Sequence, residues 1–502
     1  MRTQATLFAF AALIAGSGVA AAPANAATPV NAALPVNAAL PVNAALPVNV
    51  DGLVNAAVPV NVAGSAGGVG GPAAGLAALS DRRSADMQVM TPATAVAARS
   101  DRRPVAGGVY DAVAKKTFIS WGGQFEDNYV QAYDHRSRTW SAPVRVAGGD
   151  NDSHNYPTMI QAADGHLLVF RGLHNKELWV ARSAEPHSVD GTWTDVIIPA
   201  GLGATYPMPF RTADGTIFVF IRETAGDFDP SYPTDTRPMK YVRSTDNGLT
   251  WQSSAELTGD RWAIAPLGRP DNMNEIYIGQ LRYEPATALH KERVAIVYTL
   301  AGGGPEGHLH DRYHRNIYYT YFTPSDLHFH AAGGRDLGTT IDDPDQEQYL
   351  KVVETPLQTV NPRSPDYINL VGTTLGALPF VVWMQLDSTG QVHDQTALWS
   401  PLGGWRTREV ATGVRVRDME QIDATTWRVY GTDNAGAPGI NTYTVTAGTS
   451  WALESAIPTP QAVQRIEVIG DHRDPARILA TGASSAREVS VADGDVYVVG
   501  RP

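Results

Sequence analysis

A unit of about fifty residues, repeated along the chain, constrains its fold most strongly. The segment ADGHLLVF at 163–170 recurs fifty residues later as ADGTIFVF at 213–220, and in both copies a polar turn leads into an apolar strand. A second strand ending in serine follows each copy, as ELWVARS and MKYVRS, and a tryptophan comes after it. No long segment has helical periodicity, so short strands separated by turns predict an all-β chain.

The tryptophans are spaced as one per unit. Trp140, Trp193 and Trp251 lie 53 and 58 residues apart, and Trp405 and Trp451 end later units in the same way. An all-β repeat of this length is typical of propeller blades, and about 400 residues at roughly fifty per blade predict seven blades, with eight as the alternative. A pair of β-sandwich domains is the competing fold, but it does not explain the regular spacing.

One unit contains a recognisable turn motif. The segment STDNGLTW at 244–251 has the pattern Ser-x-Asp-x-Gly-x-Thr-Trp, an Asp-box. Asp246 can accept hydrogen bonds from backbone amides, Gly248 permits a positive φ, and Trp251 can pack between blades. The motif therefore predicts a structural turn, and its aspartate is not a catalytic candidate.

The first hundred residues have a different character. Residues 1–27 combine one arginine, an apolar run and small residues ending in ANA-A, which is the pattern of a secretory signal peptide. Residues 28–103 begin with a six-residue repeat of Pro, Val, Asn and Ala and continue as a Gly- and Ala-rich stretch. Such a composition cannot form a packed core, so we expect a disordered linker there, with a wall-associating or self-associating segment as the alternative. The β-propeller catalytic domain is expected over 104–502, in a secreted monomer without a membrane span.

Charge and composition narrow the function. The formal net charge is −12, which argues against a nucleic-acid partner because phosphate binding needs a basic surface. The chain has no cysteine, which excludes disulfide bonds, thiolate metal sites and a cysteine nucleophile. An anionic polysaccharide remains a suitable partner, since a few local arginines are enough to bind it.

Polar residues that recur at strand ends are the candidates for a functional site, because loops from successive blades converge at the axial face of a propeller. His154 precedes the strand TMIQAA, and His174 follows the strand LLVF. In the next unit Tyr206 matches the position of His154, and Arg222 matches that of His174. We expect these four side chains to face one axial cleft.

Two histidines, a tyrosine and an arginine suit β-elimination across C4–C5 of a uronic acid. Arginine neutralises the carboxylate, which makes the C5 proton more acidic. A neutral histidine takes that proton, and a tyrosine or the second histidine protonates the departing O4. This chemistry requires no cofactor and no metal site is predicted, although the sequence leaves a structural cation open.

The order of these motifs resembles the BNR-repeat polysaccharide lyases, a group that includes seven-bladed ulvan lyases and related rhamnose–glucuronate lyases. The resemblance covers roughly 104–400 and rests on DSHNYP, LHNKELWVARS, TYPMPF, YVRSTDNGLTW and HRNIYYTYF. In that group two histidines, then a tyrosine and an arginine, form the active site with the separations found here. His154 and His174 are twenty residues apart, and Tyr206 and Arg222 are sixteen apart.

The resemblance implies a role for each residue. His154 and His174 would share the duties of base and charge neutralisation, and Arg222 would bind the uronate carboxylate. Tyr206 would be the acid or base partner, and which histidine takes the proton stays open. The residues expected to contact substrate beside them are Asn155, Asn175, Tyr241 and Arg282. For the last two, a blade-packing aromatic and a surface charge are the alternatives. A zinc site held partly by cysteines, found in some ulvan lyases, is not carried over to a chain without cysteine.

Two other functions stay open. A sialidase-like glycoside hydrolase also has a propeller with Asp-boxes, but it needs an arginine triad, a Tyr–Glu pair and an acidic aspartate that we cannot assemble here. A non-catalytic glycan-binding propeller would not need the His–Tyr–Arg set. The segment GHLHDRYHRN adds His308, His310 and His314, which form either a metal cluster or a loop with unrelated histidines.

Overall fold

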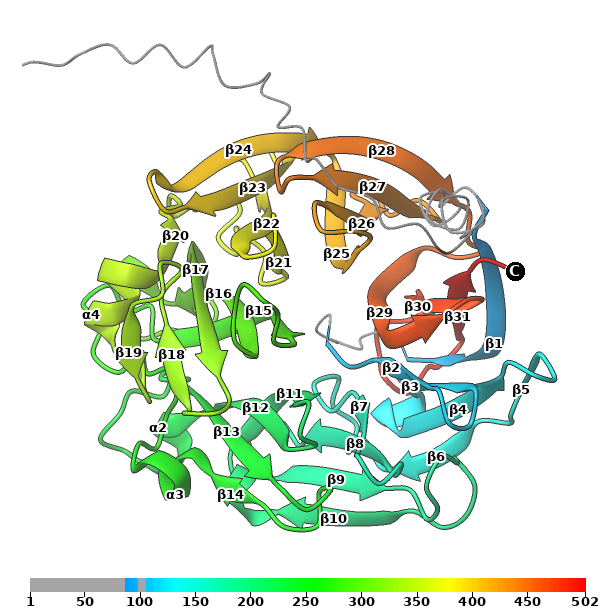
Figure 1. Cartoon of the computed structure of the whole chain (residues 1–502). Helices are drawn as coiled ribbons and strands as arrows, with labels where there is room; N and C mark the ends of the chain where they lie inside the picture. The colour runs from blue at the N-terminus through cyan, green and yellow to red at the C-terminus, as the bar shows by residue number, and fades with distance from the viewer. Residues whose placement is uncertain (1–85, 98–104) are drawn as a thin grey trace, which may run out of the picture. The chain divides into compact units, whose positions relative to one another are not determined.

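The computed structural model describes residues 86–97 and 105–502, which belong to one compact unit of short sheets around a central channel (Figure 1). The expected signal peptide and almost all of the expected linker lie outside the described residues. In the described part, the strand order resolves into seven blades, which confirms the predicted all-β propeller and its blade number. No helix in this part is long and apolar enough to cross a membrane.

The first four blades contain the following strands, with the innermost strand first. Blade one contains β2 (Gly108–Asp111), β3 (Lys116–Gly122), β4 (Asn128–Asp134), β5 (Thr139–Trp140) and β6 (Val144–Ala147). Blade two contains β7 (Thr158–Gln161), β8 (Leu167–Gly172), β9 (Leu178–Arg182) and β10 (Thr194–Ile198). Blade three contains β11 (Ala204–Arg211), β12 (Ile217–Glu223), β13 (Met239–Ser244) and β14 (Gln252–Ser253). Blade four contains β15 (Glu275–Glu284), β16 (Arg293–Gly302), β17 (Tyr313–Thr323), β18 (His328–His330), β19 (Asp336–Gly338) and β20 (Lys351–Val353).

The remaining blades complete the ring. Blade five contains β21 (Leu370–Thr374), β22 (Leu378–Leu386), β23 (Val392–Ser400) and β24 (Gly404–Thr412). Blade six contains β25 (Val414–Gln421), β26 (Thr426–Asp433), β27 (Ile440–Thr446) and β28 (Ser450–Ile457). Blade seven contains β29 (Val463–Arg473), β30 (Ala476–Gly482), β31 (Gly494–Gly500) and β1 (Gln88–Val96).

Short helices occupy the connections. They are η1 (Gln124–Glu126), η2 (Pro199–Gly201), α2 (Ala225–Phe228), α3 (Ser254–Thr258), η3 (Gly304–Glu306), α4 (Asp343–Asp345) and the π-helical turn η4 (Gln346–Leu350). The longest of them has five residues, so the helices shape loops and add little to the core.

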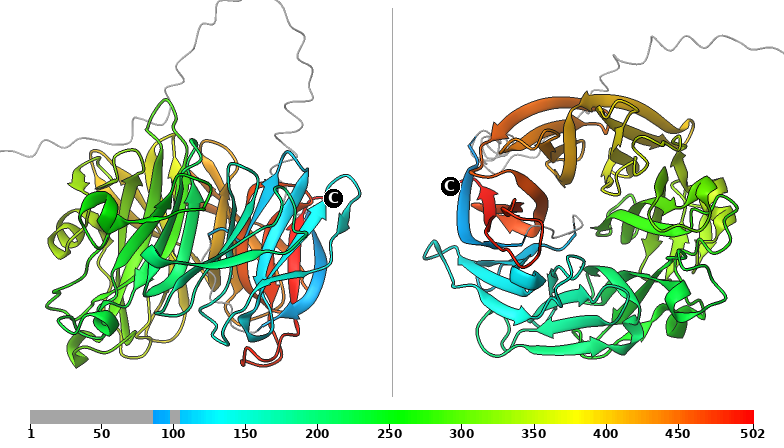
Figure 2. Two further views of the ribbon diagram at one scale, coloured as in Figure 1. Left: turned by 90° about the horizontal axis from the view of Figure 1, so that it is seen from below. Right: turned by 180° about the vertical axis from the view of Figure 1, so that it is seen from behind.

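Strand β1 closes the ring from the N-terminal side. It pairs antiparallel with β31, with Gln88 opposite Gly500, and the two lie side by side in Figure 1 and Figure 2. The sequence placed the start of the propeller at residue 104, so this strand extends the domain into the region expected to be linker. Its Pro92 and small residues conceal it in the sequence, and an edge strand tolerates proline because one side of it needs no ladder hydrogen bonds.

The hydrophobic core lies between neighbouring blades. The middle strands β8 and β12 are buried along their whole length, because the next blade covers each of their faces. Leu168 and Phe170 of blade two, for example, pack in one cluster with Ile217 and Val219 of blade three. Burial of each such side chain contributes about 1.5–3 kcal/mol, which explains why these strands are continuous apolar runs in the sequence.

The Asp-box forms the predicted turn between β13 and β14. Asp246 accepts hydrogen bonds from the amide of Thr250 at 2.9 Å and from its hydroxyl at 2.6 Å, and Gly248 has a φ of 84°. The ring of Trp251 packs edge-on against Phe170 of blade two. The motif therefore joins two blades, and its aspartate is occupied by the turn.

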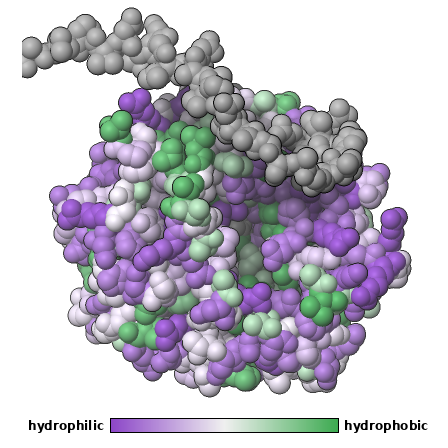
Figure 3. Space-filling model, in the orientation of Figure 1, coloured by the Kyte–Doolittle hydropathy of each residue, from purple (hydrophilic) through white to green (hydrophobic). Residues whose placement is uncertain are grey.

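The inner strands all run in the same direction along the channel, because every blade repeats the same strand order. The parallel pairing of β2 with β29 across the closure, at Val109 and Gly470, shows this directly. Residues at the starts of inner strands therefore share one end of the channel, and residues at their ends share the other. Figure 3 shows a mostly hydrophilic face that is hollowed near its centre, where the inner strands surround the channel.

Candidate active site

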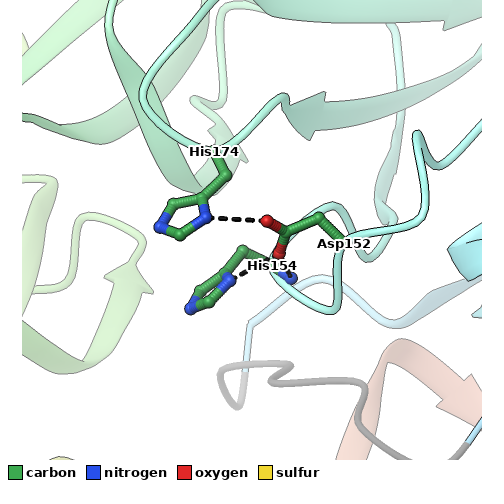
Figure 4. Close-up of side chains that lie close together, drawn as sticks. All are labelled: Asp152, His154 and His174. Atoms are coloured by element: carbon green, nitrogen blue, oxygen red, sulfur yellow. Dashed lines mark hydrogen bonds and ion pairs between the residues drawn. The ribbon is translucent and has the colours of Figure 1, made fainter. Parts of the chain in front are cut away.

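The structure brings His154 and His174 into direct contact. His154 lies in the loop before β7 and His174 in the turn after β8, and these two strands are antiparallel neighbours. The start of one strand therefore lies beside the end of the other. The two rings stack with centroids 3.8 Å apart and an interplanar angle of 23° (Figure 4).

Asp152 holds both rings. Its Oδ1 lies 2.6 Å from His154 Nδ1, and its Oδ2 lies 2.8 Å from His174 Nδ1. Burial alone would raise the pKa of Asp152, but the hydrogen bonds from the two histidines outweigh it and hold that pKa well below its usual range. In a neutral ring the Nδ1–H then donates to Asp152, which leaves the lone pair on Nε2. Both Nε2 atoms point away from the carboxylate, toward the same side (Figure 4).

The two asparagines hold the loops that carry this pair, and the substrate contacts expected of them stay predictions. The buried Asn155 donates from Nδ2 to the Gly149 carbonyl at 2.6 Å and accepts from the backbone amide of His174 at 3.0 Å. Asn175 accepts at Oδ1 from the hydroxyls of Thr205 and Thr224, at 3.0 and 2.6 Å. Because these side-chain groups are used within the protein, both residues fix the loops that carry the histidines.

Tyr206 lies beside the histidines in a strained conformation. It belongs to β11, at an irregularity in the pairing with β12 between Thr205 and Met208. Its φ is 58°, in the left-handed region that bulky residues rarely adopt. Its ring centroid lies 5.8 Å from that of His154. Strain of this kind is commonly stored at functional sites, where the surrounding structure imposes it.

Arg222 lies close to two tyrosine rings, which are themselves neighbours with centroids 6.2 Å apart. Its guanidinium carbon is 4.6 Å from the ring centroid of Tyr206 and 4.5 Å from that of Tyr277, on β15 of blade four. Burial opposes its charge, but Tyr277, Tyr206 and Glu275 outweigh it and raise the pKa of Arg222. The resemblance implied that Arg222 binds the substrate carboxylate. The residue is only 1% exposed, so in this conformation the guanidinium is not directly accessible to a substrate.

Tyr241 and Arg282 do not join this cluster. Tyr241 is fully buried on β13, where its ring packs against Phe220 and Phe322, so it has the packing role that was the alternative. Arg282 lies in the second half of β15 and donates to the carbonyls of Val371 and Met419, at 2.9 and 2.7 Å. Neither residue lies in the histidine cluster, and the substrate contacts expected of them stay predictions.

A large cavity lies at the opposite end of the channel. Its volume is about 1000 Å³, and its lining includes Gln161, Arg211, Arg282, Gln421 and His472. These residues lie at or near the ends of β7, β11, β15, β25 and β29, whereas His154, Tyr206 and Tyr277 lie before or near the starts of such strands. This cavity is therefore not beside the histidine pair.

The three later histidines are each held by a carboxylate. His308 Nδ1 lies 3.1 Å from Asp235, His310 Nδ1 lies 2.7 Å from Glu275, and His314 Nε2 lies 2.7 Å from Asp311. Each thus has a separate partner, which supports the loop interpretation over a metal cluster. The carboxylates of Asp235 and Glu275 are buried, whereas the imidazole rings that pair with them are about half exposed.

Among residues 86–97 and 105–502, one group could hold a metal ion. The ligand atoms of Asp152, His154 and His174 all lie within 4.8 Å of one another. Two imidazoles and a carboxylate are a donor set that suits zinc and related metals. The cluster is therefore either a hydrogen-bonded acid–base unit or a metal site, and these two interpretations are experimentally separable.

Sequence reasoning missed three residues of this site. Asp152 stands two positions before His154 in NDSHNYP, and an aspartate so close to a candidate histidine is a usable signal. Tyr277 lies in blade four and raises the pKa of Arg222. Arg237 lies in the loop before β13, and its charge interacts with Arg222 and Tyr206. No motif marks these two residues, because the contact depends on how neighbouring blades pack.

Comparison with known proteins defines the class. Residues 116–412 match the BNR repeat-containing family, and because this is more than half of the chain, the protein belongs to that family. Two curated relatives are ulvan lyases, from Pseudoalteromonas sp. (strain PLSV) and Alteromonas sp. (strain LOR). They are 28% identical over 162 and 166 residues, which is 27% of this chain and 31% of each relative. The match thus spans about a third of the length of these relatives.

Solved structures agree with this placement. A PL25 ulvan lyase bound to -[GlcA(1-4)Rha3S]- superposes with a TM-score of 0.64 and 17% identity, over 82% of this chain and 96% of that chain. A second structure of a PL25 ulvan lyase has a TM-score of 0.62 at the same identity, over 82% of this chain and 94% of that chain. These likenesses establish the propeller fold, and the family resemblance expected from the motifs is confirmed.

Proposed function

We propose that this protein is a secreted polysaccharide lyase that cleaves a uronate-containing polysaccharide by β-elimination. The observation that carries the proposal is the stacked His154–His174 pair on Asp152, with Tyr206 beside it. Two relatives that are ulvan lyases support the same reaction class. The substrate class is a polymer of the ulvan or rhamnosyl-glucuronate type.

The cluster contains the groups that the reaction needs. Nε2 of one histidine takes the C5 proton, the electrons of that bond form the C4–C5 double bond, and the C4–O4 bond breaks. The Tyr206 hydroxyl protonates the departing O4. The histidinium that took the C5 proton then donates a proton to the Tyr206 phenolate; the ring centroids of His154 and Tyr206 lie 5.8 Å apart. Each turnover thus leaves the protein unchanged.

Arg222 supports this cycle from beneath Tyr206. A buried positive charge 4.6 Å from the phenol ring favours the phenolate that forms when Tyr206 gives up its proton. Tyr277, whose ring centroid lies 4.5 Å from the guanidinium carbon, also contacts Arg222. Arg222 is therefore a positioning and electrostatic residue in this mechanism.

The test is to measure ultraviolet absorbance with purified protein on a panel of uronate polysaccharides that includes ulvan and gum arabic. Elimination leaves a C4–C5 double bond conjugated with the carboxylate, which absorbs in the ultraviolet, and hydrolysis does not. A rise that vanishes in His154→Ala supports the lyase. Reducing ends released without a rise indicate a hydrolase, and retained binding without products indicates a binding module.

A chelator separates the two interpretations of the histidine pair. If Asp152, His154 and His174 act as a hydrogen-bonded unit, activity survives prolonged treatment with EDTA followed by its removal. If they hold a metal, activity disappears and returns on adding zinc.

A further inference from the structure

A second cavity, between blades six and seven, is rich in arginine. Its volume is about 590 Å³. We call it the arginine cavity, because the charged residues of its lining are four arginines and one aspartate: Arg415, Arg417, Arg465, Arg487 and Asp433. The whole chain has a net charge of −12, so this positive charge is local and opposite in sign to that of the molecule. A cavity lined by one sign of charge concentrates ligands of the other sign.

The arginine cavity lies at the end of the channel that carries the histidine pair. Two of its arginines lie in the first half of β25, and Arg465 is the third residue of β29. Both strands are inner strands, and His154 likewise stands just before an inner strand. Arg487 follows β30 as His174 follows β8, in each case after the second strand of a blade. The arginines therefore occupy the blade positions that carry the histidines, in two other blades (Figure 1).

Arg417 lines the cavity at a bulge in β25. The pairing of β25 with β26 is irregular between Val416 and Asp418, and such a bulge changes the direction of the side chain it carries. Arg417 donates from Nε to the Thr432 hydroxyl at 3.2 Å, and its two terminal nitrogens make no hydrogen bond or ion pair with the described residues. Burial and the neighbouring Arg465 charge lower the pKa of Arg417 to about 10. An anion in the cavity would stabilise this guanidinium.

The carboxylates near the cavity do not neutralise its arginines. Arg415 donates from Nε to the Asn434 side chain at 2.9 Å, and its Nη1 approaches Asp366 Oδ2 only at 3.9 Å. Asp433, the aspartate of the lining, accepts from the backbone amide of Ala435 in its own turn. Neither carboxylate makes a short ion pair with an arginine of the cavity, so positive charge is left for a ligand.

The loop that carries Arg487 is held on both sides of this residue. Asp493 accepts from the hydroxyl and the amide of Ser485, at 2.5 and 2.8 Å. The Val489 carbonyl accepts from the amide of Phe125 in blade one at 2.7 Å. Arg487 itself is exposed, and its side chain makes neither a hydrogen bond nor an ion pair with the described residues. The fixed loop thus presents an unpaired cation at the cavity.

A polymer with a charge in every repeat can reach the histidine pair and the arginine cavity together, because both lie at one end of the channel. We propose that the arginine cavity binds an anionic group of the polysaccharide, on a sugar other than the one that undergoes elimination. The ligand is an oxyanion that accepts hydrogen bonds from guanidinium groups, either a carboxylate or a sulfate ester. The proposal rests on the proposed function for the identity of the polymer. A second contact on the same chain raises the affinity for the polymer.

The test measures polysaccharide binding by calorimetry in the His154→Ala background, so that the polymer is not cut. Arg417→Gln removes one charge of the cavity. Arg487→Glu reverses a charge without an internal partner, so it keeps the test decisive if Arg417→Gln does not fold. Arg408→Gln and Arg408→Glu, at an exposed position of the outer strand β24, make the same charge changes elsewhere. The probes are ulvan, ulvan without its sulfate esters, gum arabic and uncharged dextran.

The two cavity variants should weaken binding, and the controls should not. We expect the Kd for ulvan to rise about tenfold in Arg417→Gln, as for the loss of one charge-assisted hydrogen bond, and about two- to fivefold in Arg487→Glu. Both Arg408 variants keep the Kd of the parent protein, and dextran does not bind. A loss that disappears on ulvan without sulfate esters identifies a sulfate ester as the ligand, and a loss that persists there and on gum arabic identifies a carboxylate.

Three results would overturn the proposal. They are the parent Kd in both cavity variants, equal losses in the Arg408 variants, which would reflect net charge alone, and no binding of any charged probe to the parent protein.

Kinetics in the wild-type background separate this proposal from the lyase function. If a polysaccharide is cleaved and KM rises in Arg417→Gln by the same factor as the Kd, both stand. If it is cleaved with the wild-type KM in Arg417→Gln and Arg487→Glu, the lyase function stands and the cavity proposal fails. If nothing is cleaved but the cavity variants alone lose binding, the cavity proposal stands and the lyase function fails.

Discussion

The two ends of the central channel contain the same kinds of side chain but use them differently. At the far end, Glu420 is buried among donors, which are Arg428 and Tyr430 at Oε1, at 2.9 and 2.6 Å, and His472 and Arg477 at Oε2, at 2.7 and 3.0 Å. Burial opposes its charge, but His472 and Arg477 outweigh it and lower the pKa of Glu420. Both oxygens of this carboxylate are thus fully engaged.

At the end with the histidine pair, the groups are not fully engaged. Arg222 and Arg237 keep buried donor atoms without hydrogen-bond partners among the described residues, and the Nε2 atoms of both rings point away from Asp152. The cavity of about 1000 Å³ lies at the far end. The two ends thus differ in how completely these buried charged groups are hydrogen-bonded, and the cavity alone does not mark the histidine end.

Replacing one histidine at each end of the channel should give the largest difference in kcat. His174→Ala removes a ring from the stacked pair, and we expect kcat on the cleaved polysaccharide to fall by roughly 10²–10⁴-fold, the usual contribution of a general acid or base. His472→Ala should leave kcat within about twofold of wild type, since a residue away from the reacting atoms contributes little to the barrier. Equal losses in the two variants would mean that the far end also takes part in the reaction.

Removing the fully hydrogen-bonded carboxylate of Glu420 should change stability and leave activity unchanged. Glu420→Ala leaves Arg428 and Arg477 without this partner, and breaking a buried ion pair in this way costs about 3–5 kcal/mol of unfolding free energy. Guanidinium titration measures the loss, with the more exposed Glu409→Ala as the control, for which about 0–1 kcal/mol is expected. Folded Glu420→Ala should keep wild-type kcat, and a large fall would contradict a purely structural network.

Asp152→Asn should cause a smaller loss of activity at the histidine end than His174→Ala. An amide can still accept a hydrogen bond from one ring, but its NH₂ group cannot accept from the other, so one imidazole loses its orientation. We expect activity to fall by roughly 10–100-fold, as for other residues that orient a reacting group.

The same variant has a consequence for acid stability. Folding lowers the pKa of Asp152 below its ordinary value of 3.8, so its contribution to stability is present above that value and is lost as pH falls further. Unfolding measured down to low pH should show a shallower acid decline for Asp152→Asn than for wild type. An unchanged decline would show that the two histidines do not hold this carboxylate in solution.

Asp418 should change stability only over a narrow pH range. Burial raises the pKa of this far-end carboxyl from 3.8 to about 6, despite its contacts with Arg282 and Gln280. Because the folded state favours the protonated form, stability should fall as pH rises from 3.8 to 6, with a slope of at most about 1.4 kcal/mol per pH unit. Asp418→Asn should lack this slope, and unfolding titrations across the same pH range will measure it.

Repetition made most of the fold predictable. The recurrence of ADGHLLVF as ADGTIFVF and the spacing of the tryptophans follow directly from blades that pack on one another, so both appear in the sequence. The same repetition aligned His154 with Tyr206 and His174 with Arg222, and the structure brings all four together. Strand β1 was not predicted, because its sequence resembles no other unit and contains Pro92.

The residues that were misplaced show what a repeat cannot reveal. Tyr241 and Arg282 were expected to contact substrate, but position along a strand and the face of a blade decide whether a side chain reaches the site. Arg282 lies near the end of β15, and Tyr241 faces the core. Asp152 and Arg237 lie in irregular loops, where hydrogen bonding and the packing of adjacent blades determine their roles.

The pairing of β1 with β31 has a consequence for synthesis. Gln88 and its partner Gly500 are 412 positions apart in the sequence, so at about 5–20 residues per second the strand waits some tens of seconds for its neighbour. During that time the nascent chain carries an unpaired strand edge, and Pro92 together with the irregular pairing after Met90 makes that edge a poor template for other chains. Pro92 and the irregular pairing, which made this strand hard to predict from the sequence, thus also reduce aggregation of the nascent chain until the ring closes.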